Sequence, residues 1–180
     1  IAFLLHEEAE RHGFKRTNYG EYLEKFPPQY EVQIRPGEGT SWSCVHGVGR
    51  WKEDCGCHTG GQPGWNQKWR GPLREVIRFL EERLGRLYQK EAQGFFRDPE
   101  AARDGYVELI LDPSLQARNR FFEKYSDRPL SFAEQVRALK LLEMERFAML
   151  TQTSCGWFFN DISGIETVQI LRYAFRSLEL

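Results

Sequence analysis

The sequence predicts a mainly α-helical protein. We expect a bundle of about five helices, with a short α/β segment in front and a long Gly/Cys/Trp-rich loop. Apolar residues recur every three or four positions over most of residues 72–178, the period of an amphipathic helix. Capping boxes mark two helix starts, because Ser131 precedes Glu134, and Ser163 precedes Glu166, by three positions. Residues 40–71 show no regular period and are rich in glycine, as an irregular loop is.

The N-terminal segment predicts two short helices and one strand. A helix is expected over residues 1–12, because its apolar and charged residues separate and Gly13 provides a stop. Thr17 is a good N-cap for a second helix over residues 17–26, which a Pro-Pro pair ends. Residues 30–35 alternate apolar and polar side chains, which is typical of a short strand.

The remainder of the chain predicts the helical bundle. The expected helices cover residues 72–88, 98–111, 114–125, 131–151 and 163–178. The helix over 131–151 is apolar on most sides, so we expect it to be central. We expect the last helix to bury one apolar face, formed by Ile165, Val168, Leu171, Phe175 and Leu178.

Composition excludes several classes of partner. The chain has 180 residues, a net charge of −1 and no basic block, so we expect no nucleic-acid partner. No apolar run approaches the ~20 residues of a membrane span, so we expect no membrane insertion. The sequence begins with Ile1 rather than Met, and we expect it to be a piece of a longer, cytoplasmic protein.

Cysteine and histidine residues predict a metal site in the loop. Four thiolates, or three thiolates and an imidazole, suit zinc, and four thiolates also suit an iron–sulfur cluster. The alternatives are reduced core thiols, a disulfide in an exported protein, and a reactive cysteine. The candidate ligands are Cys44, Cys55, Cys57, Cys155, His46 and His58.

Tryptophans in and beyond the same loop predict a surface for sugars, because an indole ring can stack on the apolar face of a pyranose. The alternative is that these rings bury the loop and form a small satellite core. The candidate carbohydrate contacts are Trp42, Trp51, Trp65, Trp69, Trp157 and Asp161. Asp54 and Asp161 would make a glycosidase pair only if they met, and nothing in the sequence indicates that, so we assign no catalytic residue.

Several strings of the sequence resemble the C-terminal region of glycoside hydrolase family 57-like proteins. More closely, they resemble a domain of unknown function that is attached to a subset of that family. The strings are residues 19–25 (YGEYLEK), 27–28 (PP), 40–44 (TSWSC), 50–61 (RWKEDCGCHTGG), 65–70 (WNQKWR), 153–159 (TSCGWFF) and 161–167 (DISGIET). Together they span nearly the whole chain and are rich in rare residues.

The resemblance implies a non-catalytic accessory domain that helps to form or close a sugar cleft. Residues 1–35 would be the end of an upstream barrel, and residues 36–180 the helical C-terminal domain, with the loop 40–71 included. The catalytic Glu and Asp would lie upstream, so the partners would be that barrel and an oligo- or polysaccharide. The family's sugar site often has a Ser-Asp-Trp-like element. Here Cys155 stands where the Asp is expected, which favours a structural or metal role for this cysteine. The alternatives are a metal- or iron–sulfur-binding structural or redox module, and a plain interaction domain without a ligand.

Overall fold

The computed structural model describes residues 2–34, 37, 39–41 and 43–180. The chain divides into two compact units, Ile1–Gly37 and Glu38–Leu180. Within the described ranges every regular element is a helix, so the predicted α class is confirmed, with more helices than the sequence indicated. None of these helices has the length and apolar character needed to cross a membrane.

The first unit consists of α1 (Ala2–Arg11) and α2 (Tyr19–Lys25). Both predicted helices are confirmed, but the N-cap of α2 is Asn18, whose Oδ1 accepts from the backbone N–H of Glu21 at 2.9 Å. The predicted strand is wrong over its described residues, 30–34, which are irregular and exposed; its last residue lies outside the described part. Alternating apolar and polar side chains indicate only that a segment can form a strand. A strand is stabilised by pairing with a neighbouring strand.

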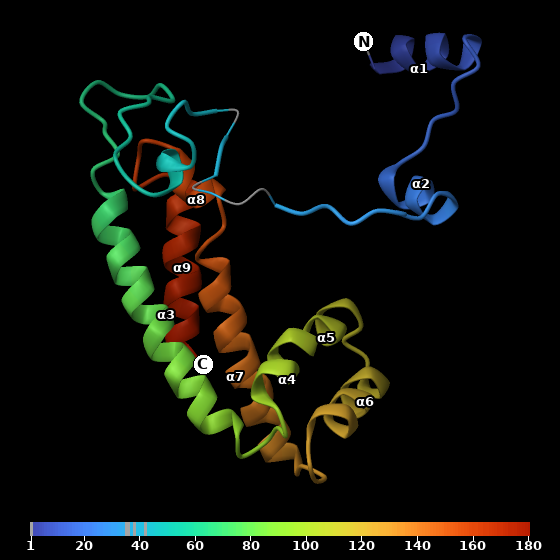
Figure 1. Ribbon diagram of the computed structural model, residues 1–180, viewed down its shortest axis with the longest axis vertical. Coiled ribbons are helices and arrows are strands. Elements are labelled where there is room, and N and C mark those ends of the chain that lie inside the picture. The colour runs from blue at the N-terminus through green and yellow to red at the C-terminus, as the bar shows by residue number, and fades with distance from the viewer. Residues whose placement is uncertain (1, 35–36, 38, 42) are drawn as a thin grey trace. The chain divides into compact units, whose positions relative to one another are not determined.

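The second unit is built on three long helices that run side by side (Figure 1): α3 (Arg70–Ala92), α7 (Phe132–Leu150) and α9 (Ile165–Glu179). The short helices α4 (Pro99–Gly105), α5 (Val107–Leu111) and α6 (Leu115–Tyr125) lie at one end of them. The 3-10 helix η1 (Gly49–Trp51) and α8 (Cys155–Phe158) lie at the other end, where α8 contacts both η1 and α9.

Two hydrophobic clusters fill this unit. The larger cluster joins α3, α4, α6 and α7; its largest buried members are Tyr88, Phe96, Phe121, Phe122, Leu142 and Met144. The smaller cluster joins α3, α8 and α9 through the buried residues Ile77, Trp157, Ile170 and Ala174. Each end of the long helices therefore has its own core.

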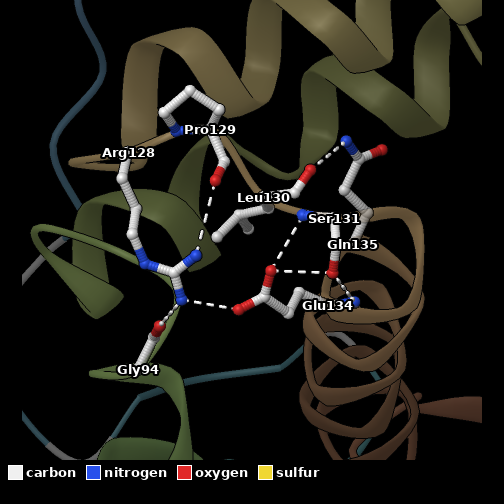
Figure 2. Close-up of polar contacts among 7 residues, drawn as sticks. All are labelled: Gly94, Arg128, Pro129, Leu130, Ser131, Glu134 and Gln135. Atoms are coloured by element: carbon white, nitrogen blue, oxygen red, sulfur yellow. Dashed lines mark hydrogen bonds and ion pairs between the residues drawn. The ribbon is translucent and has the colours of Figure 1, made fainter.

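The predicted capping box of α7 is confirmed (Figure 2). Ser131 Oγ accepts from the backbone N–H of Glu134 at 3.3 Å, and Glu134 Oε2 accepts from the backbone N–H of Ser131 at 2.8 Å. Arg128 donates to the other carboxylate oxygen of Glu134 at 2.6 Å. The Arg128 guanidinium and the Ser131 hydrogen bonds lower the pKa of Glu134 to about 2.

The second predicted capping box and the predicted buried face of α9 are wrong. Gly164 is the N-cap of α9, and the Ser163 hydroxyl donates to Asp161 instead. The residues that α9 buries are Thr167, Ile170, Ala174 and Ser177, while Ile165, Leu171, Phe175 and Leu178 are exposed. The helix period was right, but small and hydroxyl side chains allow closer packing than the bulky face does.

Candidate metal centre

The cysteine loop, which we define as residues 43–69, turns by means of glycines. Gly56 stands between Cys55 and Cys57 with a φ of 76°, in the left-handed region that other residues rarely adopt. Gly47 follows His46 with a φ of 63°, and a Cβ there would lie 2.7 Å from the carbonyl oxygen of Gly39. Larger residues at these two positions would strain the turns that carry the thiols and the imidazole.

Four side chains of this loop converge on one point. The Sγ atoms of Cys44, Cys55 and Cys57 and a ring nitrogen of His46 all lie within 4.8 Å of one another. Cys44 Sγ is 3.9 Å from Cys55 Sγ and 3.7 Å from Cys57 Sγ. His46 Nδ1 is 3.5 Å from Cys44 Sγ and 3.4 Å from Cys57 Sγ. A zinc tetrahedron with Zn–S bonds of about 2.3 Å has S···S edges of about 3.8 Å, which these distances match.

The surroundings of the group favour ionisation of one thiol. Cys44 is buried, Cys55 and Cys57 are half-buried, and His46 is exposed. Burial opposes ionisation of Cys44, but hydrogen bonds from the backbone and side chain of His46 outweigh it and lower its pKa to about 6. Hydrogen bonding to Cys44, followed by burial, raises the pKa of Cys57. One thiolate is therefore available near neutral pH, and metals bind thiolates rather than thiols.

A layer of polar side chains anchors the group to the helices. The Cys55 thiol donates to Gln67 Oε1 at 3.4 Å, and Gln67 Nε2 donates to the backbone carbonyl of Cys57 and, at 2.7 Å, to Asn160 Oδ1. Asn160 follows α8, and its Nδ2 donates to the carbonyl oxygen of Gly60 at 2.8 Å. Arg70, the first residue of α3, donates to Gln67 Oε1 at 2.9 Å. The loop is thus held by hydrogen bonds to both α3 and the segment after α8.

Two predicted ligands lie outside the group. Cys155 is exposed at the start of α8 and is not among the converging residues. The His58 side chain is also outside the group, and its Nδ1 accepts from the backbone N–H of Gly60 at 3.0 Å. The four residues that meet form two local pairs, Cys-x-His at 44–46 and Cys-x-Cys at 55–57. Pairing within one short loop was the sequence signal that separates them from Cys155.

Three of the six predicted sugar contacts pack in the smaller core. Trp157 has no exposed surface, and its Nε1 donates to the carbonyl oxygen of Thr151 at 2.9 Å. Trp69 is half-buried and stacks on Trp157, with a 6.2 Å distance between ring centroids. Trp51, also half-buried, packs on Phe158 with a 5.7 Å separation. These three rings belong to the smaller core, as the satellite-core alternative expects.

The other predicted sugar contacts are placed differently. Trp65 belongs to the cysteine loop and is 41% exposed. Asp161 is half-buried, and Oδ1 of its carboxylate accepts from the backbone N–H of Ser163 at 2.9 Å. Trp42 lies outside the described residues. Trp65 is therefore the most exposed candidate ring among those that the structure describes.

Comparison with known proteins identifies the helical part of the chain. The model of the family described as "Domain of unknown function (DUF3536)" matches residues 65–180. This range covers α3 to α9 and begins after the converging cysteines and His46. Neither the curated proteins nor the solved structures gave a match. The predicted relation to a domain of unknown function is confirmed, and the chain belongs to the DUF3536 family.

Proposed function

We propose that the cysteine loop binds one zinc ion through Cys44, His46, Cys55 and Cys57, and that this ion has a structural role. The observation that carries the proposal is the convergence of three sulfurs and one imidazole nitrogen within 4.8 Å of one another. Four protein ligands complete the tetrahedral shell of zinc, which leaves no position for a water molecule or a substrate. Such a closed site supports folding rather than catalysis.

The distances favour one zinc ion over a disulfide and over an iron–sulfur cluster, two of the alternatives that the sequence left open. A disulfide needs an S–S separation of about 2.05 Å, whereas Cys44 Sγ is 3.7 and 3.9 Å from the other two sulfurs. An iron–sulfur cluster places several iron and sulfide atoms between its ligands. Ligand atoms this close together leave room for a single ion.

The role of the ion follows from the sequence of the loop. Residues 43–69 contain no α-helix, and many of their backbone groups depend on turns and side chains rather than on a regular ladder. A long irregular segment loses much conformational entropy when it is ordered. Binding of zinc to two segments of the loop, residues 44–46 and 55–57, offsets that loss, because the free energy of metal binding becomes free energy of folding.

Metal analysis and four variants test the proposal. The purified chain should hold one zinc ion, and Co²⁺ in its place should show the absorption of a tetrahedral thiolate complex. Cys57→Ser and His46→Ala should lose tight binding. Cys155→Ser and His58→Ala are matched controls, since these residues lie outside the group, and they should bind as the wild type does. A wild-type chain without stoichiometric metal, or equal losses in all four variants, would refute the proposal.

We also propose that the domain acts as a non-catalytic accessory domain of a glycoside hydrolase family 57-like protein, docked on a catalytic barrel beside the sugar cleft. The supporting observation is the apolar face of α9. The face is formed by the exposed side chains of Leu171, Phe175 and Leu178, which are spaced by four and three residues. Ile165 is also exposed, but its position in the helical period places it on another side of the helix. Bulky apolar residues in one row on a solvent-exposed helix are typical of a surface that a partner covers.

Docking to a separately produced barrel of such a protein tests this second proposal. Phe175→Glu combined with Leu178→Glu should weaken binding at least tenfold in calorimetry, because a buried charge without a partner costs about 1.4 kcal/mol or more. Phe132→Glu, on an exposed residue in the first turn of α7, is the control. Trp65→Ala should weaken binding of an α-glucan oligosaccharide to the docked complex. Docking that tolerates both glutamates, or hydrolysis of the glucan by this chain alone, would rule the proposal out.

A further inference from the structure

Arg70 is a fully buried arginine at an unusual position. It is the first residue of α3, where the helix dipole disfavours a positive charge and where the first turn contains no acidic residue to offset it. The N-cap, Trp69, makes no side-chain capping hydrogen bond. The local sequence of the helix therefore gives no reason for a cation here, and the reason has to come from the tertiary surroundings.

The guanidinium of Arg70 joins the cysteine loop to the end of α8. One terminal nitrogen donates to Phe158 O at 2.7 Å and to Phe159 O at 2.9 Å. The other donates to Gln67 Oε1 at 2.9 Å and to Glu53 O at 3.3 Å. All of these acceptors are neutral, and none of the ion pairs among the described residues involves Arg70, so its hydrogen bonds are satisfied at both terminal nitrogens without a directly paired anion.

The Nε of Arg70 is buried and has no hydrogen-bond partner, and the same is true of Nε of Arg50. Arg70 shares the acceptor Gln67 Oε1 with the Cys55 thiol, which places this cation beside a proposed zinc ligand. Arg50 is 7% exposed and lies over the Phe158 ring, at 4.6 Å from its centroid. Both buried cations thus have an unpartnered donor, and Arg70 borders the group of cysteines.

A negatively charged metal centre would supply the anion that the buried Arg70 needs. One zinc ion with three thiolates and a neutral imidazole carries a single negative charge. A buried cation is costly unless an anion lies close to it. Resting on the proposed zinc site, we infer that Arg70 is a positioning residue of that centre: it balances the charge of the zinc-bound thiolates and holds them against the end of α8.

The inference predicts that the metal and α8 are coupled. When zinc leaves, the buried Arg70 loses the negative charge of the metal centre beside it. The carbonyls of Phe158 and Phe159 then lose a rigid donor, so the turn between α8 and α9 loosens together with the loop. The coupling needs no movement of the long helices, because both segments meet at one guanidinium.

Three variants of the 180-residue chain and two readouts test the inference. Competition with a chromophoric chelator measures zinc affinity, and the thiolate-to-metal charge-transfer band of the Co²⁺ form reports electron density on the sulfurs. Arg70→Met should lower zinc affinity 10- to 100-fold, as loss of an outer-layer partner of a metal ligand does. It should also shift the band to lower energy, because a sulfur without a nearby cation donates more readily. Arg70→Lys keeps the charge and should recover part of both effects.

Arg74→Met is the matched control. Arg74 lies one turn further along α3, donates to the carbonyl oxygen of Trp51 at 2.9 Å and is half-buried, but it contacts no cysteine. The Arg74→Met variant should be less stable than the wild type, but its Co²⁺ form should show the charge-transfer band at the wild-type energy. An Arg70→Met chain with the wild-type affinity and band overturns the inference while leaving the zinc site intact, and an equal shift in Arg74→Met does the same. A wild-type chain that binds no zinc instead overturns the proposed function.

Hydrogen exchange on the wild-type chain covers the case in which Arg70→Met does not fold. Removing zinc should lower the protection of amides in residues 155–164 as well as in the cysteine loop. Unchanged protection of residues 155–164 would overturn the inference, because the counter-charge would then have no effect on the turn that Arg70 holds.

Discussion

The two ends of the helical unit are held together by different forces. At the end formed by α4 and α6, aromatic rings pack on one another: Phe121 and Phe122 meet edge to face with a 5.6 Å centroid distance, and Phe96 stacks on Phe122 at 6.3 Å. At the end that carries the cysteine loop, the buried set includes polar side chains, among them Gln67 and Arg70. One end is an apolar core, and the other is a polar network around a group of cysteines.

This difference shows how a chain can order a segment that is too polar and too rich in glycine to bury itself. Burial of apolar surface stabilises the aromatic end in proportion to its area. The loop end has the small cluster around Trp157 and gains the rest from directional contacts that need a counter-charge. Removal of the metal or of a buried charge should therefore destabilise the loop end. Truncation of a buried side chain should destabilise the aromatic end.

The largest effect should follow removal of the proposed zinc ion by a chelator. Structural zinc sites contribute roughly 10 kcal/mol of apparent binding free energy, so the cysteine loop should lose most of its ordered state. Hydrogen exchange should show lost protection in residues 43–69 and unchanged protection in α6 (Leu115–Tyr125). Equal loss at both ends would break the comparison, because it would mean that they unfold as one unit.

Phe121→Ala tests the aromatic end. Phe121 is fully buried among other rings, and truncation of such a side chain costs about 3–5 kcal/mol. Urea denaturation should show this loss, while zinc affinity stays at the wild-type value. Phe132→Ala, at an exposed position, should change stability by no more than about 0.5 kcal/mol. A large fall in zinc affinity in Phe121→Ala would contradict the independence of the two ends.

Gly156→Ala tests the close contact between α8 and α9. A Cβ at this position would lie 2.0 Å from Cγ1 of Ile170, so the Ile170 side chain or α9 itself has to shift, at a cost of about 1–3 kcal/mol. Gly85→Ala is the control within α3, since its Cβ meets no atom within 4 Å, and it should stabilise the chain by about 0.5–1 kcal/mol. Thermal melts of both variants provide the measurement, and a neutral Gly156→Ala would argue against tight packing here.

Ser131→Ala tests the capping box at the start of α7. Loss of an N-cap side chain costs about 1 kcal/mol, and the cost should appear in urea denaturation. The box lies beside the aromatic end, so zinc affinity should stay the same in this variant. Stability equal to that of the wild type would show that water replaces the Ser131 hydroxyl without loss.

The smallest effect should be a pH dependence that arises from Glu134. The Arg128 guanidinium and Ser131 lower the pKa of this carboxyl to about 2 in the folded chain. A depressed pKa stabilises the fold above the pKa of the unfolded chain, and this contribution is lost as the pH falls towards 2. Glu134→Gln should therefore show a flatter decline of stability than the wild type between about pH 5 and pH 2. A decline of the same slope in both proteins would assign the pH dependence to other groups.

The sequence predicted where a helix begins when the N-cap side chain bonds to the backbone of its own first turn. Ser131 begins α7 as its capping box indicated, and Ser114 caps α6 by accepting from the backbone N–H of Ala117. The same reasoning failed for Ser163, because Asp161 competes for its hydroxyl. It also failed for the exposed strand pattern over residues 30–34, since a strand depends on a partner that the pattern does not specify.

The candidate metal site was predicted in part. Residue chemistry alone indicated three thiolates and an imidazole as one suitable ligand set, and it placed most of the candidates in one loop. It also included Cys155 and His58, which the structure does not bring into the group. It missed Gln67, Arg70 and Asn160, because amides and arginines are common and nothing in their spacing marks them as partners of a cysteine.

The sequence by itself determined the helical class, the starts of α6 and α7, and the supply of soft ligands, because periodicity, capping and side-chain chemistry act over a few residues. Tertiary structure alone decided which ligands meet and which face of α9 is buried. It also decided that a cation at the start of α3 lies beside a thiol. These outcomes depend on contacts between segments far apart in the chain, where close packing and charge balance, rather than local preference, select the arrangement.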